Sequence, residues 1–218
     1  MQTVVLLIFF AIIPIVPVFL WFRARNFGRL RLLLSLAAGL LAVIVAGLAQ
    51  SFFPPPYTQA GIGALLFGVF VRISLIEELS RFLTLFLLFR FTYCRISFPG
   101  SSDPVPLASQ GFLGAPSGLA AGLGFAAGES IFYGITDSGT AFLRIFTAAP
   151  LHAACGTRIG TALGILRKEP IRASTLILTA VIIHGMYNFF ILSPGIPPLL
   201  PGLIALSALG SSLLALRR

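Results

Sequence analysis

The chain has 218 residues, of which 57% are hydrophobic and 10% are charged, and its mean hydropathy is +1.01. A soluble domain of this length carries far more polar surface, so this composition excludes a water-soluble fold and predicts an integral membrane protein. The net charge of +9 comes almost wholly from arginines in short segments between apolar runs, which favours a role in membrane topology over nucleic-acid binding.

Continuous apolar runs, each close to the ~20 residues that cross a bilayer, predict an all-α, polytopic transmembrane helix bundle. The runs lack the ten-residue alternation of a barrel. We predict seven spans, at residues 4–22, 32–50, 61–89, 111–135, 141–166, 173–192 and 198–216. The third run is too long for an upright span and is expected to tilt, break or project into the interface. The whole chain, 1–218, is predicted to be one transmembrane domain, with an N-terminal two-span hairpin (4–50), a core (61–192) and a C-terminal span (198–216).

The connections between these spans alternate in charge. Segments 23–31, 90–95 and 167–172 and the last two residues are basic, whereas 51–59, 136–140 and 193–198 contain no basic residue. By the positive-inside rule the N-terminus is outside, the C-terminus is cytoplasmic, and the protein is a multi-pass cell-membrane protein. The first run has no basic residue before it, which predicts a retained anchor rather than a cleaved signal peptide. The two cysteines, Cys94 and Cys155, predict no disulfide framework.

Ionisable side chains lie inside the predicted spans, although each costs ~2.5–3.5 kcal/mol at the bilayer centre. Among them are Glu77, Glu78, Arg81, Glu129, His152 and His184. Arg81 follows the glutamate pair by three and four residues, so it shares their helix face and could simply fix helix packing. Three glutamates and two histidines together weaken that structural interpretation and indicate a functional site.

The positions of these residues along the spans predict that several of them meet. Glu77, His152 and His184 fall near the middle of their predicted spans, whereas Glu129 falls nearer the outer leaflet. Glycine pairs 118/122 and 124/128, and small residues that continue from His152 at i+4 spacing, predict close helix packing around the site. His184 shares a face with Asn188, and Glu129 shares one with Phe125 and Tyr133.

This set of side chains suits peptide hydrolysis. A glutamate removed from water is a useful base for a water nucleophile, and imidazole and amide groups can donate to the oxyanion of a tetrahedral intermediate. Two histidines and one glutamate also form a ligand set for catalytic zinc with one position open for water. The residues alone leave the choice between these two mechanisms open.

Other intramembrane hydrolase types fit the sequence less well. There is no HExxH motif, and no aspartate lies in a predicted span, which argues against zincin-type and aspartyl-dyad chemistry. Ser117 follows a proline and has no suitably placed histidine, and Cys155 is better explained as a packing residue than as a nucleophile paired with His152.

Four motifs in chain order resemble the PrsW family of intramembrane proteases, which is related to the CAAX-processing and bacteriocin-immunity membrane proteases. They are Glu77-Glu78-x-x-Arg81, the segment "GLGFAAGESIFYG" with Phe125, Glu129 and Tyr133, "LHAACG" with His152, and "HGMYN" with His184, Tyr187 and Asn188. The resemblance covers about residues 61–192. It departs at Arg81, where PrsW proteins commonly have lysine, and at Glu129, where the CAAX group has a histidine.

The resemblance implies proteolysis of a membrane protein substrate, often an anti-sigma factor in regulated intramembrane proteolysis. By the same resemblance, Glu77 is the base, Glu78 is its partner, and His184 and Asn188 form the oxyanion side. His152 is the second histidine, and Arg81, Tyr133 and Tyr187 support the site. Glu129 is then catalytic, a metal ligand or a pocket-shaping group. No cofactor is required in the glutamic-type mechanism that we favour, and in a metallo-type mechanism Glu77, His152 and His184 would hold Zn²⁺.

Two other function classes use buried glutamate and histidine. A proton-coupled transporter would place them along a relay, but no inverted repeat is evident in the sequence. A non-enzymatic membrane scaffold would retain its function after Glu77→Gln. The substrate, the cleavage site, the oligomeric state and any need for a prior cleavage are not encoded in recognisable motifs.

Overall fold

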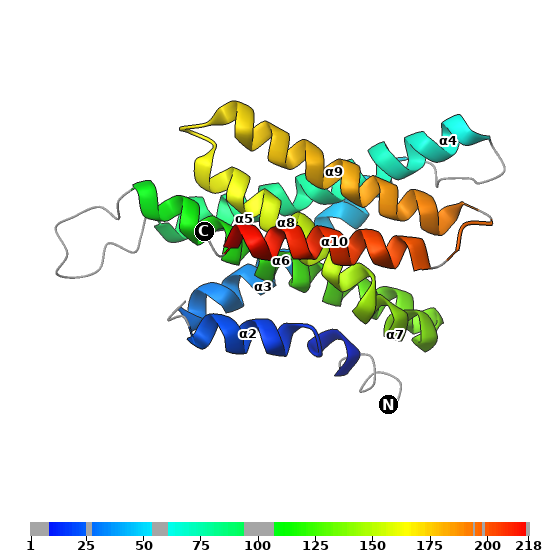
Figure 1. Ribbon diagram of the computed structural model, residues 1–218, viewed down its shortest axis with the longest axis horizontal. Helices are drawn as coiled ribbons and strands as arrows, with labels where there is room; N and C mark the ends of the chain where they lie inside the picture. Colours follow the sequence, from blue (N-terminus) through cyan, green and yellow to red (C-terminus); the bar gives the residue numbers. More distant parts are fainter. Residues whose placement is uncertain are drawn as a thin grey trace.

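The structure, a computed structural model, describes residues 9–24, 28–53, 61–93, 107–193, 195–197 and 199–216 (Figure 1). Within these ranges the regular elements are helices and there is no strand, which confirms the all-α prediction. The helices are α2 (Ile15–Ala24), α3 (Arg29–Gln50), α4 (Ile62–Phe67), the π-helical η2 (Gly68–Leu75), α5 (Ile76–Tyr93), α6 (Leu107–Thr136), α7 (Ser138–Phe146), α8 (Ala148–Ile165), α9 (Pro170–Leu192) and α10 (Leu199–Leu216). Cys94 lies outside the described residues.

The long helices run back and forth along one axis of the molecule (Figure 1). The start of α3, the end of α5, the turn between α8 and α9, and the end of α10 lie at one end of the bundle. The end of α3, helix α7 and the start of α10 lie at the other end. Among the described residues, the basic side chains of these connections, such as Arg29, Arg90, Lys168 and Arg172, therefore lie at one end, as the charge alternation predicts. Which end faces the cytoplasm remains a prediction from the positive-inside rule.

Three described helices are long and apolar enough to cross a membrane by length and composition: Arg29–Gln50, Gly114–Thr136 and Pro170–Leu192. Shorter apolar helices cover Phe9–Phe22 and Leu199–Leu214. Large apolar side chains are exposed along these helices, including Leu178 and Ile182 on α9. Such surface belongs in lipid rather than water. The chain is an integral membrane protein, and the number of seven spans stays a prediction.

Two predicted spans differ in the structure. The long run 61–89 continues to Tyr93 as one unbroken helical stretch, in which the π-helical η2 separates α4 from α5. The prediction of one helix over 141–166 was wrong, because the backbone turns at Thr147 (φ −118°, ψ −64°) between α7 and α8. Asp137 caps the start of α7 by accepting hydrogen bonds from the hydroxyl of Thr140 and the backbone N–H groups of Gly139 and Thr140. These bonds lower the pKa of the Asp137 carboxyl below its usual value.

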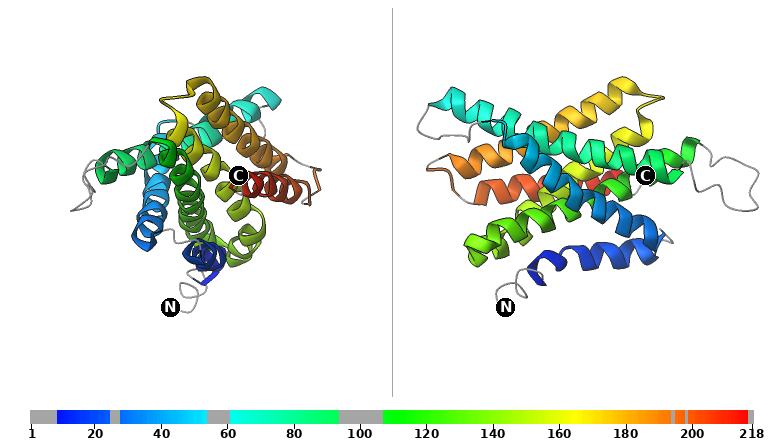
Figure 2. Two further views of the ribbon diagram at one scale, coloured as in Figure 1. Left: turned by 60° about the vertical axis from the view of Figure 1, so that its left-hand side comes forward. Right: turned by 180° about the vertical axis from the view of Figure 1, so that it is seen from behind.

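Helices α6 and α8 form the centre of the bundle. Their backbones touch where Gly118 of α6 faces Gly156 of α8: a Cβ atom on either glycine would overlap the carbonyl oxygen of the other. On its other side α6 packs against α3, and a Cβ on Gly124 would overlap the carbonyl oxygen of Leu36. Viewed from behind, α3 (blue) lies toward the viewer and crosses the blue-green α5 (Figure 2, right). The predicted small-residue contacts are confirmed, and they bring His152, one turn before Gly156, against α6.

Replacing Gly156 by alanine is expected to destabilise the fold by roughly 1–3 kcal/mol, because the added methyl group overpacks the contact between α6 and α8. Gly47→Ala is the matched control, since a Cβ on this helical glycine meets nothing within 4 Å. Thermal unfolding in detergent checks both variants. Equal melting temperatures for Gly156→Ala and Gly47→Ala would contradict the proposed close approach.

Candidate active site

The glutamate pair follows directly on the π-helical segment. η2 ends at Leu75, and Glu77 and Glu78 lie in the first turn of α5. π-Helical turns are rare and occur mostly at functional sites, because the wider turn re-aims the side chains that follow. η2 packs against α9 through Phe70, whose ring occupies the space that a Cβ on Gly185 would need. This contact places the glutamate pair next to His184.

Glu78 is at the centre of a buried ion cluster. Its Oε1 accepts hydrogen bonds from Arg81 Nη2 at 2.6 Å and from His184 Nδ1 at 2.7 Å. Glu78 and Arg81 are both 0% exposed, and the guanidinium of Arg81 also lies 4.5 Å from the centre of the Phe125 ring. Because the carboxylate accepts from Nδ1, we assign the Nδ1–H tautomer to a neutral His184, which leaves its Nε2 lone pair free.

Glu77 has one engaged and one free carboxylate oxygen. Its Oε1 accepts a hydrogen bond from Gln50 Nε2 at 3.1 Å, across from the last residue of α3. Its Oε2 is buried and has no hydrogen-bond partner among the described residues. The nearest imidazole nitrogen, His184 Nε2, is 3.6 Å from this oxygen. Oε2 of Glu77 can therefore accept a proton from water. Glu78 Oε2 is also buried without a hydrogen-bond partner, but the charge of that carboxylate is held by Arg81 and His184, which makes Glu77 the better base.

His152 is held at both of its ring nitrogens. Arg81 Nη2 lies 3.1 Å from Nδ1, and a guanidinium can only donate, so this nitrogen accepts. The Nε2–H then donates to Glu129 Oε2 at 2.7 Å. The same oxygen of Glu129 accepts from Arg144 Nη2 at 2.5 Å. The rings of His152 and His184 meet edge to face with their centres 5.0 Å apart.

The structure brings together the six predicted ionisable residues: Glu77, Glu78, Arg81, Glu129, His152 and His184. Among the three predicted residues beside this cluster, Tyr187 is buried and donates to Thr147 Oγ1 at 3.0 Å, whereas Tyr133 is exposed and contacts the guanidinium of Arg144 with its ring. Asn188 is half-buried, one turn after His184, and no hydrogen bond joins its side chain to another described residue.

Sequence reasoning missed two residues of the network, Gln50 and Arg144. Gln50 closes a predicted span and looks like a boundary residue, and Arg144 has its acidic partner fifteen residues away in sequence. The predicted midplane depth is also shifted for His152, which is the fifth residue of α8 because the helix starts only after Thr147. The cluster lies toward the end of the bundle where α3 ends and α7 sits (Figure 1).

Comparison with known proteins gives one family. A family model described as PrsW family intramembrane metalloprotease matches residues 28–210. The chain belongs to this family. Neither the curated proteins nor the solved structures contain a significant match. The match covers the whole ion cluster together with α3 to α9, which confirms the resemblance drawn from the four motifs and makes intramembrane peptide hydrolysis the activity class of this PrsW-family protein.

The family description implies a metal ion. Glu77, His152 and His184 could hold one, since a ligand atom from each lies within 4.8 Å of the other two. This donor set suits catalytic zinc. His184 is prepared for ligation, because Glu78 binds Nδ1 and leaves Nε2 free, an arrangement typical of zinc-bound histidine. His152 could ligate through either nitrogen only by releasing Arg81 or Glu129.

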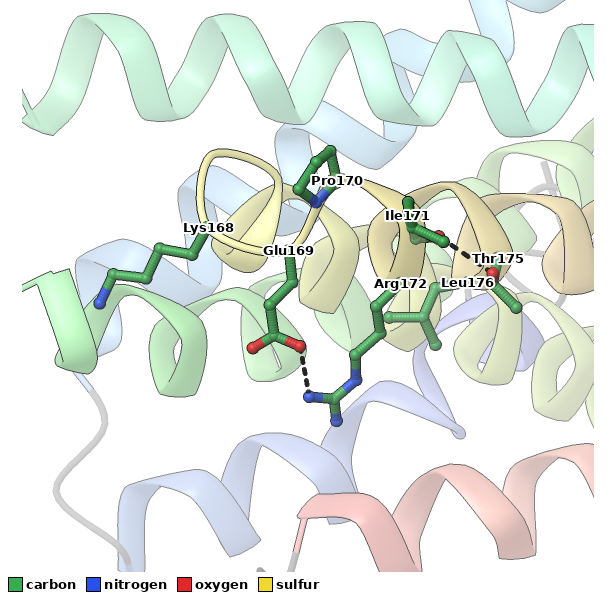
Figure 3. A pocket seen from close by; sticks show the side chains of 7 residues that line it. All are labelled: Lys168, Glu169, Pro170, Ile171, Arg172, Thr175 and Leu176. Atoms are coloured by element: carbon green, nitrogen blue, oxygen red, sulfur yellow. Dashed lines mark hydrogen bonds and ion pairs between the residues drawn. The ribbon is translucent and has the colours of Figure 1, made fainter.

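A surface hollow of the PrsW-family protein lies elsewhere. It surrounds the turn between α8 and α9 and is lined by Lys168, Glu169, Pro170, Ile171, Arg172, Thr175 and Leu176 (Figure 3). Within it Arg172 donates to Glu169 at 2.9 Å, on the exposed surface. None of the cluster residues lines this hollow, which is at the end of the bundle opposite to α7 (Figure 1). The hollow is therefore separate from the candidate active site.

Proposed function

We propose that this protein is an intramembrane endopeptidase in which Glu77 activates the water that hydrolyses a peptide bond of a membrane protein substrate. The observation that carries the proposal is the asymmetry of the Glu77 carboxylate. Gln50 fixes Oε1, while Oε2 is buried, has no hydrogen-bond partner among the described residues, and has His184 Nε2 as its nearest imidazole nitrogen at 3.6 Å. A buried carboxylate with one fixed and one free oxygen is oriented for general-base catalysis.

The reaction can be written with the residues of this chain. Glu77 takes a proton from water as the water oxygen bonds to the scissile carbonyl carbon, which forms a tetrahedral oxyanion. As the C–N bond breaks, Glu77 returns that proton to the leaving amide nitrogen. The products are a carboxylic acid and an amine, and the carboxylate of Glu77 is regenerated.

Stabilisation of the oxyanion is assigned to His184 and Asn188. Their spacing of four residues places both on one face of α9. The Asn188 amide, which has no hydrogen bond to the described residues, can donate to a substrate oxygen. Three carboxylates and two guanidiniums leave the cluster with one net negative charge when both imidazoles are neutral. With its proton on Nδ1, a neutral His184 has no N–H at Nε2 to offer the oxyanion, so the Asn188 amide is the first donor and His184 orients the site from the same helix face.

Three residues of this site could bind a zinc ion. Glu77, His152 and His184 would hold the ion, which when bound would polarise the scissile carbonyl and acidify a water ligand. The metal-free mechanism is favoured by the engagement of both nitrogens of His152, one with Arg81 and the other with Glu129. To bind a metal ion, His152 needs a ring nitrogen with a free lone pair. Here the lone pair of Nδ1 accepts from Arg81, and Nε2 carries the proton that is donated to Glu129.

The arrangement of the network argues against a proton pathway. It runs from Gln50 at the end of α3, through the glutamates and histidines, to Arg144 on α7. Both of its ends lie at the same end of the bundle (Figure 1). A proton relay would instead have to connect the two sides of the membrane.

The substrate class and cellular setting follow from the PrsW resemblance and from the charge pattern. We place the protein in the cell membrane as a multi-pass protein with the N-terminus outside. Its substrate is a membrane protein of the anti-sigma-factor type, and the reaction belongs to regulated intramembrane proteolysis. The catalytic unit is the helical core over residues 61–192.

Zinc removal tests the mechanism. Membranes containing wild type or His184→Ala at matched expression are compared by mapping new protein termini, with and without a zinc chelator. We expect new termini that depend on His184 and persist after chelation. Loss of these termini on chelation, together with one zinc per purified chain, would contradict Glu77 as the base and make it a metal ligand.

A further inference from the structure

Helix α7 connects α6 to α8 and has two different faces. Phe142, Leu143 and Phe146 are 46%, 63% and 58% exposed, as expected of side chains that contact lipid. From the same helix Arg144 points the other way, with only 13% of its side chain exposed. A charged side chain turned inward from an otherwise lipid-facing helix needs a partner inside the protein.

Arg144 finds that partner at the edge of the active site. Its Nη2 donates to Glu129 Oε2 at 2.5 Å, and its guanidinium lies 4.5 Å from the centre of the Tyr133 ring. Both partners are on α6, one turn apart. The ion pair therefore fixes the Glu129 carboxylate at the same oxygen to which His152 donates.

Glu129 in turn determines how His152 is held. One oxygen, Oε2, receives hydrogen bonds from both Arg144 and His152 Nε2. On the other side of the ring, Arg81 donates to Nδ1. Two arginines on different helices thus fix one imidazole, Arg81 directly and Arg144 through Glu129. Without Arg144, Glu129 keeps a single fixed partner and can turn away from the ring.

We propose that Arg144 is a positioning residue of the active site, which acts through Glu129 to hold the His152 ring with its Nε2–H directed at Glu129 and its Nδ1 at Arg81. Arg144 does not touch the substrate in this role. The kinetic part of the proposal rests on the hydrolase function proposed above, whereas the structural part does not. Glu129 is accordingly a pocket-shaping group between Arg144 and His152.

The structural part can be tested directly because the chain contains only two histidines. In protein labelled with ¹⁵N-histidine and purified without a polyhistidine tag, NMR shows just these two rings, and His152→Gln identifies its signals. We expect wild type to show a single Nε2–H tautomer for His152, and Arg144→Gln to show mixed tautomers. Arg144→Lys should restore the single tautomer, and Arg172→Gln, which removes an exposed ion pair at the other end of the bundle, should change nothing. An unchanged His152 signal in Arg144→Gln would overturn the proposal.

The kinetic part uses a double-mutant cycle on a membrane substrate that wild type cleaves in a Glu77-dependent way. Arg144→Gln and Glu129→Gln should each lower kcat about 10-fold, the usual effect of losing an outer-shell partner, with KM unchanged. The double variant should be no slower than either single variant, because both act through one contact. Additive losses would overturn the proposal. Absence of Glu77-dependent cleavage in wild type would instead overturn the hydrolase function, and the NMR result would still decide the role of Arg144.

Discussion

Replacing Arg81 by methionine is expected to lower the free energy of unfolding by about 3–5 kcal/mol, the usual result of removing one partner from a buried ion pair. Arg81 is fully buried and donates to Glu78 at 2.6 Å and to His152 Nδ1 at 3.1 Å. Methionine fills much of the volume but donates to neither. The carboxylate of Glu78 would then stay buried with His184 as its remaining described partner. Thermal or denaturant unfolding in detergent measures the loss.

Two variants separate this effect from a general effect of losing an arginine. Arg172→Met removes an ion pair that is 67% and 47% exposed, for which losses below about 1 kcal/mol are typical. Adding Glu78→Gln to Arg81→Met removes the uncompensated charge and should restore part of the stability. If Arg81→Met proved as stable as Arg172→Met, the buried ion pair would not be holding the site together.

Replacing Glu77 by glutamine is expected to lower the rate of peptide hydrolysis by roughly 10²–10⁴-fold, the usual contribution of a general base. Glutamine has nearly the same shape and can still accept a hydrogen bond from Gln50 through its carbonyl oxygen. It cannot take a proton from water. The fold should therefore survive while the rate falls, which single-turnover cleavage of a reconstituted membrane substrate would show.

The matched control for Glu77→Gln is Gln50→Leu. This variant keeps the base and removes only the donor to Oε1, so it should lower the rate less than Glu77→Gln does. A rate for Glu77→Gln equal to wild type, in protein with a wild-type melting temperature, would remove Glu77 from the reaction. Function retained in Glu77→Gln is also the result that the scaffold alternative predicts.

The six residues of the cluster could be predicted from the sequence because an ionisable side chain inside the bilayer carries a free-energy cost and therefore indicates a functional or structural need. Glu77, Glu78 and Arg81 lie within one helical turn and a half, so their shared face follows from helix geometry. His152 and His184 are the only histidines, and both fall in apolar runs. The glycines around His152 indicate close packing, and the structure confirms it between α6 and α8.

The remaining features depend on contacts between distant segments. A π-helical turn such as η2 has no distinctive sequence pattern, because it is set by how Phe70 packs on Gly185. The break at Thr147 lies inside an apolar run, and its one local signal is Pro150 in the first turn of α8, which cannot donate a backbone hydrogen bond to Phe146. Gln50 and Arg144 gain their roles only from partners 27 and 15 residues away. The spacing of apolar residues along the chain predicts none of these contacts.

Proteolysis by Glu77 is tested most directly by comparing protein termini in native-host membranes that contain wild type or Glu77→Gln at matched expression. We expect new termini near the membrane spans of specific membrane proteins in wild type and their absence in Glu77→Gln. Those termini would also name candidate substrates. Identical sets of termini in both membranes, across several stress conditions, would contradict intramembrane proteolysis by Glu77 and favour a transport or scaffold role for the buried cluster.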